Sequence, residues 1–214
     1  MNRLPSLVRQ HIAALRLLLA FTVLCGIVYP VVMWGVAQVA FKGQADGSLV
    51  TFNGQVVGSS LLCQEFVNAK GAPLPQYFQS RPSNATSGAS TDYGCDPGYS
   101  GASNLSASNP VLVGRIKQLQ ADVSKLDGVP ISQIPADAVT ESGSGLDPDI
   151  SVANAEIQVK RVATTRHLSV ATVQALVNKY TTGRDLGFLG EPAVNVLDLN
   201  IALDELPGQA AYIK

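Results

Sequence analysis

The sequence has no acidic residue before Asp46 and only two histidines, His11 and His167, in 214 residues. Metal and general-base sites usually recruit histidine, and no His, Cys or carboxylate group here shows ligand spacing. We therefore expect neither a metal site nor a catalytic centre. No Walker-type Gly-Lys-Ser/Thr occurs, and the repeat at 142–145, Ser-Gly-Ser-Gly, lacks the Gly-x-Ser-x-Gly frame of a nucleophile turn. This repeat predicts a tight structural turn.

Charge is unevenly distributed along the chain. Arg3, Arg9, Arg16 and Lys42 are the only charged side chains before Asp46. Subtracting these 4 cations from the 15 Lys and Arg leaves 11, so residues 43–214, which hold all 16 acidic residues, carry a formal charge of 11 − 16 = −5. Such a segment disfavours nucleic acid and anionic lipid surfaces as partners.

Residues 17–41 form an uncharged, largely apolar run. As a helix at about 1.5 Å per residue, the run is about 37 Å long, enough to cross a hydrocarbon core of about 30 Å. A cleaved signal peptide is the alternative, but its apolar region is shorter and ends in small residues, whereas Gln38 stands where a small residue is needed. We expect an uncleaved transmembrane helix over 17–41. Lipid contact follows from that assignment.

Three residues of the run point to partners inside the membrane. Pro30 removes one helical hydrogen bond, and the freed carbonyl favours a neighbouring helix. Tyr29 and Trp34 add polar groups near it. We interpret Tyr29, Pro30 and Trp34 as a partner interface.

The flanking cations predict the topology. By the positive-inside rule, residues 1–16 are a cytoplasmic flank and residues 42–214 an extracytoplasmic domain. Cys25 then lies in the span, and Cys63 and Cys95 lie in an oxidising compartment. These two cysteines either form a disulfide or remain two isolated buried thiols.

Local patterns predict a mixed α+β domain after the span. Asn53-Gly54 favours a hairpin over 47–58, and residues 71–110 read as a long loop-rich region. Apolar residues at steps of three and four predict a helix from Asn109-Pro110 to about 126, and two more helices follow over 151–166 and from Ser169 to about 180.

Shorter sequence patterns predict the secondary structure at the end of the domain. Residues 194–199 are rich in β-branched and aliphatic side chains and predict a strand, followed by a short helix over 201–206. Asp147 and Asp149 are expected to cap the helix that begins near Ser151.

The segment Tyr77-Phe78 with Arg81-Pro82 has two interpretations. A proline of fixed φ beside a guanidinium and two aromatic rings makes a stiff recognition loop, which makes Tyr77, Phe78 and Arg81 candidate partner contacts. Alternatively, Arg81 stacks on its own domain. The residues alone favour an anchored interaction module over an anchored enzyme.

Taken in order, the segments resemble the KdpC family, the C subunit of the bacterial potassium-transporting P-type ATPase, across nearly the whole chain. The matching segments are Val28-Tyr29-Pro30, Gly47-Ser48-Leu49, Gly58-Ser59-Ser60-Leu61-Leu62 with Gln64 and Phe66, Tyr77-Phe78 with Arg81-Pro82-Ser83, residues 100–105, Ser108-Asn109-Pro110, residues 139–151, and Asn195-Val196 to Asp204. The chain departs from the usual pattern at Ala102, Asn84, Glu141 and Asp149, and Cys63 and Cys95 are not signatures of the family.

The resemblance implies a non-catalytic accessory subunit of a high-affinity potassium uptake complex in the bacterial inner membrane. Its implied partners are a channel-like A subunit that binds the ion and a P-type B subunit that hydrolyses ATP. No firmly bound cofactor is implied. The resemblance also implies a catalytic chaperone that raises the ATP affinity of the B subunit, with Gln64 as a nucleotide contact.

The predicted topology conflicts with that nucleotide contact, because ATP is cytoplasmic and Gln64 is placed outside. We therefore favour an acidic domain that organises the outer entrance of the channel-like subunit and attracts potassium. Two other interpretations stay open. One is an anchored enzyme with Ser142 or Ser144 as nucleophile, and the other is a free-standing solute-binding module.

Overall fold

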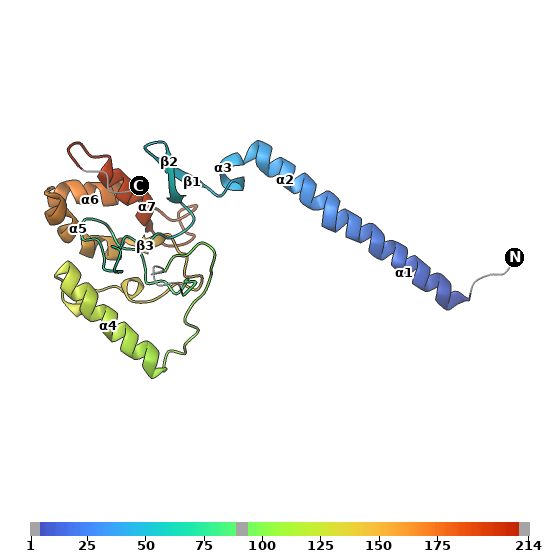
Figure 1. The fold of residues 1–214 in the computed structure, drawn as a ribbon, viewed down its shortest axis with the longest axis horizontal. Coiled ribbons are helices and arrows are strands. Elements are labelled where there is room, and N and C mark those ends of the chain that lie inside the picture. Colours follow the sequence, from blue (N-terminus) through green and yellow to red (C-terminus); the bar gives the residue numbers. More distant parts are fainter. Residues whose placement is uncertain (1–4, 89–93, 210–214) are drawn as a thin grey trace. The chain divides into compact units, whose positions relative to one another are not determined.

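A computed structural model describes residues 5–88 and 94–209. The chain folds as two compact units, Met1–Ser48 and Leu49–Lys214, and each is described by itself. The first is a helix long enough and apolar enough to cross a membrane, and the second is a mixed α/β domain (Figure 1). The predicted fold class is confirmed.

The first unit is one long helix and a short helical turn. Its elements are α1 (Ser6–Val23), the π-helical turn η1 (Leu24–Val28), α2 (Tyr29–Ala40) and α3 (Lys42–Ala45). The candidate span is Ser6–Ala40, so the helix begins eleven residues before the apolar run at 17–41. None of the residues in α1, η1 and α2 is buried within the chain. Its apolar surface therefore needs lipid or another protein.

The π-helical turn accommodates Pro30. Proline has no N–H for the usual bond to Gly26, and the preceding Tyr29 N–H bonds Leu24 O, five residues back. A single widened turn is a common way for a helix to absorb such a defect. The helix continues through Pro30 as α2.

The second unit contains two small antiparallel sheets. The hairpin of β1 (Leu49–Phe52) and β2 (Gln55–Ser59) turns at Asn53 and Gly54, whose φ angles of 51° and 78° confirm the predicted turn. The other sheet has the order β3-β5-β4, with β3 (Asp149–Ser151), β4 (Thr181–Thr182) and β5 (Ala193–Asn195). Ile150 pairs with Val194 at its centre, and both are buried.

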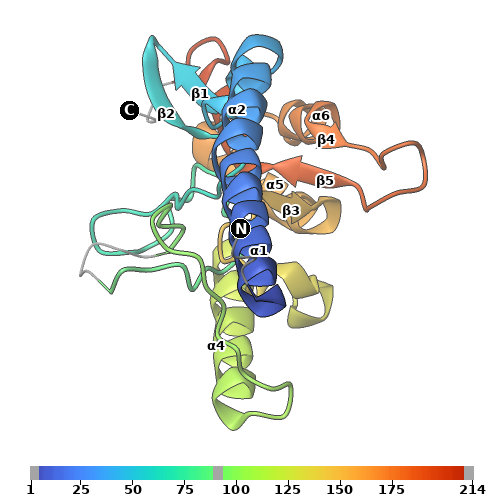
Figure 2. The same cartoon turned by 90° about the vertical axis from the view of Figure 1, so that its right-hand side faces the viewer.

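Helices α5 (Val152–Arg166) and α6 (Val170–Lys179) pack against each other and beside this sheet (Figure 2). Their predicted starts are confirmed, because Ser151 Oγ accepts from Asn154 N and Ser169 Oγ accepts from Thr172 N. Between them His167 takes a left-handed φ of 56° and ends α5.

The predicted strand over 194–199 is wrong beyond Asn195. Helix α7 (Val196–Asp204) begins there, and its first turn is capped by the Asn195 side chain, which accepts from Asp198 N. Nearly all of α7 is buried, so apolar residues occupy every face of the helix. A helix that is apolar all round has the same short apolar run as a buried strand, and periodicity does not separate the two.

The long loop region is confirmed in the described part of 71–109, which holds no helix and no strand longer than an isolated bridge. It leads into α4 (Pro110–Asp127), which starts at the Asn109 cap and ends at Gly128 with φ 68°. The apolar stripe of α4 is half-buried. Short 3₁₀ turns η2 (Ile131–Gln133) and η3 (Ala136–Ala138) follow.

Candidate functional site

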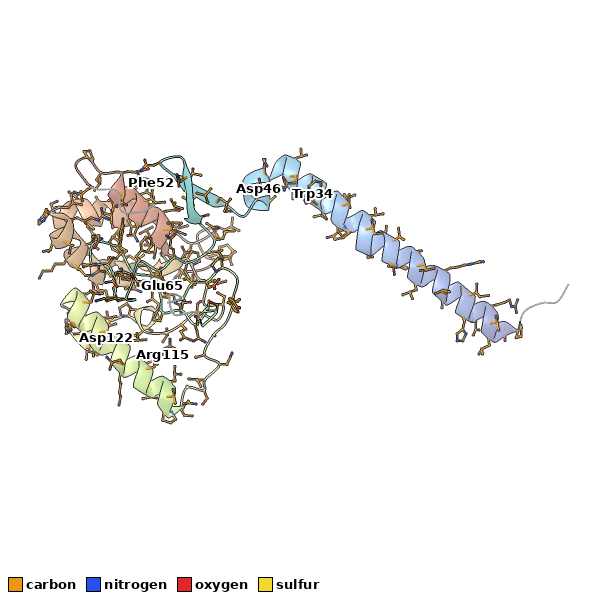
Figure 3. The ribbon with its side chains drawn as sticks, in the orientation of Figure 1. Trp34, Asp46, Phe52, Glu65, Arg115 and Asp122 are labelled. Carbon is orange, nitrogen blue, oxygen red and sulfur yellow. A yellow bond between two sulfur atoms is a disulfide. The ribbon has the colours of Figure 1, made fainter. Side chains whose placement is uncertain are left out.

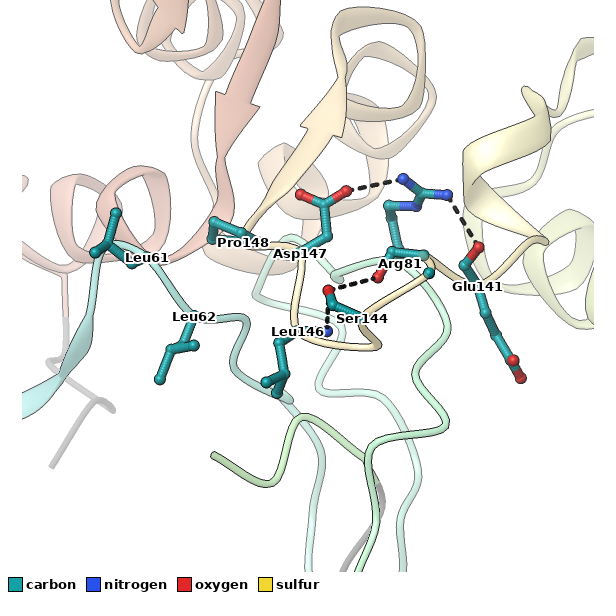
Figure 4. Close-up of a pocket in the computed structure, with 10 residues that line it drawn as sticks. Leu61, Leu62, Arg81, Glu141, Ser144, Leu146, Asp147 and Pro148 are labelled. Carbon is teal, nitrogen blue, oxygen red and sulfur yellow. Dashed lines mark hydrogen bonds and ion pairs between the residues drawn. The ribbon is translucent and has the colours of Figure 1, made fainter. Parts of the chain in front are cut away.

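The Ser-Gly repeat forms one wall of an open cavity of about 610 Å³. Figure 4 shows the repeat facing Leu61 and Leu62 across this hollow, with Arg81 and Asp147 at its upper edge. The lining residues are Leu61, Leu62, Arg81, Glu141, Ser142, Gly143, Ser144, Leu146, Asp147 and Pro148. Loops 61–62, 81 and 141–148 therefore converge on one site.

Both serines of the repeat hold the turn together. Ser142 Oγ accepts from Gly145 N at 2.9 Å, and Ser144 Oγ accepts from Leu146 N at 3.1 Å. Ser144 O accepts from Gly101 N and Ser100 Oγ. These contacts are those of serines that cap turns rather than of an activated nucleophile.

Gly145 is required by both its backbone and its neighbours. Its φ is +70°, and a Cβ built on it lies 2.5 Å from Gly101 O and 2.9 Å from Ala85 N. Gly143, two residues earlier, has no atom within 4 Å of such a Cβ. Gly143 can therefore be replaced by a larger residue, whereas position 145 accepts only glycine.

Arg81 binds its own domain and not a partner, which is the second of the two interpretations of this segment. Its Nη1 donates to Asp147 Oδ2 at 2.8 Å, and its Nη2 donates to Glu141 O at 3.2 Å. A guanidinium with donors in a fixed fork ties two segments more firmly than lysine does. Arg81 fixes the Ser-Gly turn, and Asp147 pairs with Arg81 instead of capping α5.

Asp137 takes the role predicted for Asp147 and Asp149. Its two carboxylate oxygens accept from Ser151 N, Ser151 Oγ and Asn154 Nδ2 at the start of α5. A carboxylate at a helix N-terminus is favoured by the helix dipole. Asp137 lies 14 residues before Ser151, so only the folded chain brings the two together.

The prediction of Tyr77 and Phe78 as partner contacts is corrected by their burial. Both are in the core, with Tyr77 1% and Phe78 0% exposed. Tyr77 OH donates to Asp204 Oδ2, and Phe78 N donates to Asn200 Oδ1, so α7 holds them from within. Burial, and then the Asp204 carboxylate, raise the pKa of the Tyr77 hydroxyl above its usual range. Neither ring is part of the surface.

Cys63 and Cys95 form a disulfide beneath the Ser-Gly turn. Cys63 N donates to Leu146 O, and Cys95 N donates to Ser83 Oγ, which itself donates to Gly145 O. The bond closes a loop 32 residues long, a constraint of the kind that stabilises a fold by about 2–4 kcal/mol. It stabilises the loop-rich region where regular structure is sparse.

Gln64 lies half-buried beside the disulfide. A Cβ on Gly58 would lie 2.8 Å from Gln64 Oε1, so this side chain packs tightly against β2. The surrounding cavity of about 350 Å³ is lined by Glu65 and, among the residues the structure describes, by no lysine or arginine. A phosphate group there would meet a carboxyl and no cation.

Glu65, labelled in Figure 3, is a half-buried carboxyl of the second unit. It lines a cavity of about 670 Å³ together with Leu119, Val123 and Leu126 of α4. No described residue donates a hydrogen bond to it, because Cys95 Sγ, 3.8 Å from Glu65 Oε1, is a disulfide sulfur without a proton. Desolvation raises the pKa of Glu65 to about 7.

The raised pKa of Glu65 makes the free energy of unfolding depend on pH. Its pKa is near 4.5 in the unfolded chain and about 7 in the folded domain, so the folded state holds a proton that the unfolded state releases between these values. Its contribution to stability therefore falls as pH rises from about 4.5 to 7 and is lowest above pH 7. We expect Glu65→Gln to raise the free energy of unfolding by about 2 kcal/mol at pH 8 and by almost nothing at pH 4.5.

The control for this prediction is Glu156→Gln, which changes an exposed carboxyl on α5. Denaturant unfolding of the full chain in detergent at pH 4.5, 6 and 8 measures both variants. If the two variants differ from the parent equally at all three pH values, the Glu65 carboxyl does not titrate in this range.

The predicted membrane contacts lie together on one helix. Tyr29 is 62% and Trp34 67% exposed, and Pro30 is the second residue after the π-helical turn. They face nothing within the described chain, so they are free for lipid or protein. They belong to the first unit, whereas the residues that line the Ser-Gly cavity belong to the second.

No cluster of three or more His, Cys, Asp or Glu side chains with metal-binding geometry occurs within residues 5–88 and 94–209. Sequence reasoning missed Glu65, Asp137 and two buried ion pairs, Asp127 with Arg161 and Asp204 with Arg166. For the ion pairs the signal was charge inside otherwise apolar helical patterns, and Glu65 and Asp137 lie outside the long helices. That signal does not identify the partner.

Comparison with known proteins assigns the chain to a family. The family model described as "K+-transporting ATPase, c chain" matches residues 11–205. A potassium-transporting ATPase KdpC subunit of Streptomyces avermitilis is 47% identical over 218 residues, covering 96% of this chain and 97% of the relative. The KdpC subunit of Mycobacterium tuberculosis is 46% identical over 199 residues, covering 92% and 99%. That of Gemmatimonas aurantiaca is 47% identical over 206 residues, covering 96% and 98%. The chain therefore belongs to the KdpC family, the c chain of the K+-transporting ATPase.

Proposed function

We propose that this chain is the accessory subunit of a potassium-pumping P-type ATPase, needed for assembly and activity, with ATP hydrolysis carried out by a partner. The observation that carries the proposal is the family match over residues 11–205, which includes both the helix and the domain. Relatives named KdpC subunit cover 92–96% of the chain. The expected partners are a channel-like A subunit and a P-type B subunit.

The long helix supports a role inside the membrane. It buries none of its residues within the chain, and Tyr29, Pro30 and Trp34 lie on it. Helices in lipid associate through close packing and polar contacts, which an isolated span lacks. In this proposal the helix packs against the channel-like subunit.

The charge pattern supports an outer position for the domain. Arg9 and Arg16 precede the apolar run at 17–41, and residues 43–214 carry a formal charge of −5. A negative potential at the outer mouth of a potassium channel raises the local concentration of the ion. The proposal thus places the domain in the periplasm of a bacterial inner membrane.

The engaged hydroxyls of Ser142 and Ser144 support a non-catalytic role. Each accepts a backbone N–H of its own turn. Labelling of either serine by a fluorophosphonate probe would contradict this part of the proposal.

Deletion of the chain tests the proposal directly. We expect membranes lacking it to lose potassium-stimulated ATP hydrolysis, and we expect the tagged full chain to purify with two larger subunits. A reporter fused after Asp46 is expected to report the periplasmic side. Undiminished turnover without the chain would overturn the proposed function.

The catalytic-chaperone role with Gln64 as nucleotide contact stays a prediction. The acidic lining of its cavity argues against direct contact with ATP phosphates. In the complete complex, Gln64→Ala is expected to leave the KM for ATP unchanged if the domain acts from the outer side. A raised KM with the same kcat would favour the nucleotide contact instead.

A further inference from the structure

The connection between β4 and β5 exposes three large apolar side chains. Leu186 is 83%, Phe188 69% and Leu189 50% exposed. We call these three residues the apolar tip. In Figure 2 this connection extends away from the sheet and the helices beside it. Contiguous exposed apolar side chains on a soluble domain commonly mark an interaction site.

Backbone hydrogen bonds close the turn that carries the tip. Phe188 N donates to Asp185 O at 3.2 Å and closes a tight turn, and Asp185 and Leu189 exchange two bonds of 2.9 Å. Gly187 N donates to Arg184 O. Four amides of the turn, those of residues 185, 187, 188 and 189, are therefore already paired and lose no hydrogen bond when the turn leaves water.

Leu186 contradicts the turn's own preferences. Its φ is +52° and that of Gly187 is +81°, the pattern of a type I′ turn, whose first central position favours Asn, Asp or Gly. A branched side chain there is strained, and its exposure shows that it gains no packing within the domain. Local rules are usually broken where function requires it.

Charged groups surround the tip. Arg184 pairs with Glu191 at 2.6 Å across the base of the loop, and the exposed Asp185 has no ion pair among the described residues. An apolar centre with a polar rim is the usual anatomy of a protein interface, in which a few aromatic and aliphatic anchors carry the affinity. The rim places one unpaired carboxylate beside the apolar anchors.

The observations favour a protein partner over a lipid surface. Residues 43–214 carry a formal charge of −5, which repels anionic lipid. The family is one chain of an ATPase with other subunits. We propose that the apolar tip docks into an apolar socket, edged by a cationic side chain, on another subunit of the same ATPase. This inference rests on the proposed function.

Leu186→Asn is the decisive variant because folding and docking predict opposite effects. Asparagine suits the positive φ, so we expect the thermal midpoint of the full chain in detergent to stay the same or rise. Loss of the apolar anchor is expected to weaken association with the partner subunits at least about tenfold. Phe188→Ser is expected to weaken it by as much or more.

Val111→Ser is the matched control, since Val111 is 67% exposed on α4, far from the tip in sequence. Co-purification of tagged full-length chains from membranes, with titration of the partner subunits, measures all three variants. If the wild-type chain retains no partner, the proposed function fails. If the wild-type chain and both tip variants retain partners equally, only the docking inference fails.

A lipid-binding tip is distinguished by fluorescence. Phe188→Trp is made in a Trp34→Phe chain, which removes the one native tryptophan. In vesicles that contain this chain alone, docking into a subunit predicts water-exposed emission that brominated lipid does not quench. Quenching by brominated lipid in these vesicles would overturn the inference in favour of a membrane contact.

Discussion

Replacing Arg166 by methionine is expected to lower the free energy of unfolding by about 3–5 kcal/mol. Arg166 Nη2 donates to Asp204 Oδ1 at 2.7 Å, and the two side chains are 1% and 0% exposed. The change leaves the Asp204 carboxylate buried without its cation. It also removes the guanidinium that lies 4.8 Å from the centre of the Tyr77 ring and donates to Gln76 O.

The double variant Arg166→Met with Asp204→Leu separates charge from packing. Apolar replacement of a whole buried pair is often close to neutral, but Asp204→Leu also removes the acceptor of the Tyr77 hydroxyl, so we expect the double variant to recover part of the lost stability. The control is Glu191→Gln, which breaks the exposed pair with Arg184 and is expected to change stability by less than about 0.5 kcal/mol. Urea unfolding of the full chain in detergent, followed by circular dichroism, measures all three. Equal effects of Arg166→Met and Glu191→Gln would show that the buried pair does not hold the fold.

Local signals were sufficient for the elements that start or turn at a single residue. Asn53-Gly54 predicted the β1–β2 turn, and Asn109-Pro110 predicted the start of α4. Ser151 and Ser169 predicted α5 and α6. In each case the hydrogen bond or φ angle that defines the start or turn lies within three residues of the signal, so the local sequence is enough to predict it.

Long-range contacts determined what the sequence did not reveal. Tyr77 and Asp204 are 127 residues apart, and Phe78 and Asn200 are 122 apart. Aromatic rings beside an arginine and a proline suit a recognition loop and a core segment equally well. Only the position of α7 decides between them. The first part of α7, residues 196–199, was itself predicted as a strand, because the helix carries apolar residues on all its faces.

The candidate site follows the same division. The repeat at 142–145 was correctly interpreted as a structural turn, since its glycines and serines satisfy local backbone geometry. The ion pair that fixes this turn joins Arg81 to Asp147, 66 residues apart. Binding of Arg81 to its own domain was one of the two interpretations that the sequence left open. The apolar tip was missed because Leu and Phe in a loop give no periodic signal, and exposure is visible only in the folded domain.

Replacing Gly145 by alanine is expected to lower the free energy of unfolding by roughly 2–5 kcal/mol. The new Cβ would lie 2.5 Å from Gly101 O, a backbone atom that has little freedom to move, and the +70° φ adds strain. Gly101 N is held by Ser144 O at 2.8 Å, so moving the neighbour would break a bond of the same turn. Loss of the turn would also release Leu146, which accepts from Cys63 N beside the disulfide.

Gly143→Ala is the internal control for that variant. It stands in the same repeat, no atom lies within 4 Å of its built Cβ, and its φ is not in the left-handed region. We expect it to change stability by less than about 0.5 kcal/mol. Thermal and denaturant unfolding of both full-length variants measures the difference. If Gly143→Ala were as damaging as Gly145→Ala, the repeat would matter for flexibility at both positions. The stability of the Ser-Gly turn would then not depend on the close contact of Gly145 with residues 85 and 101, because Gly143 makes no such contact.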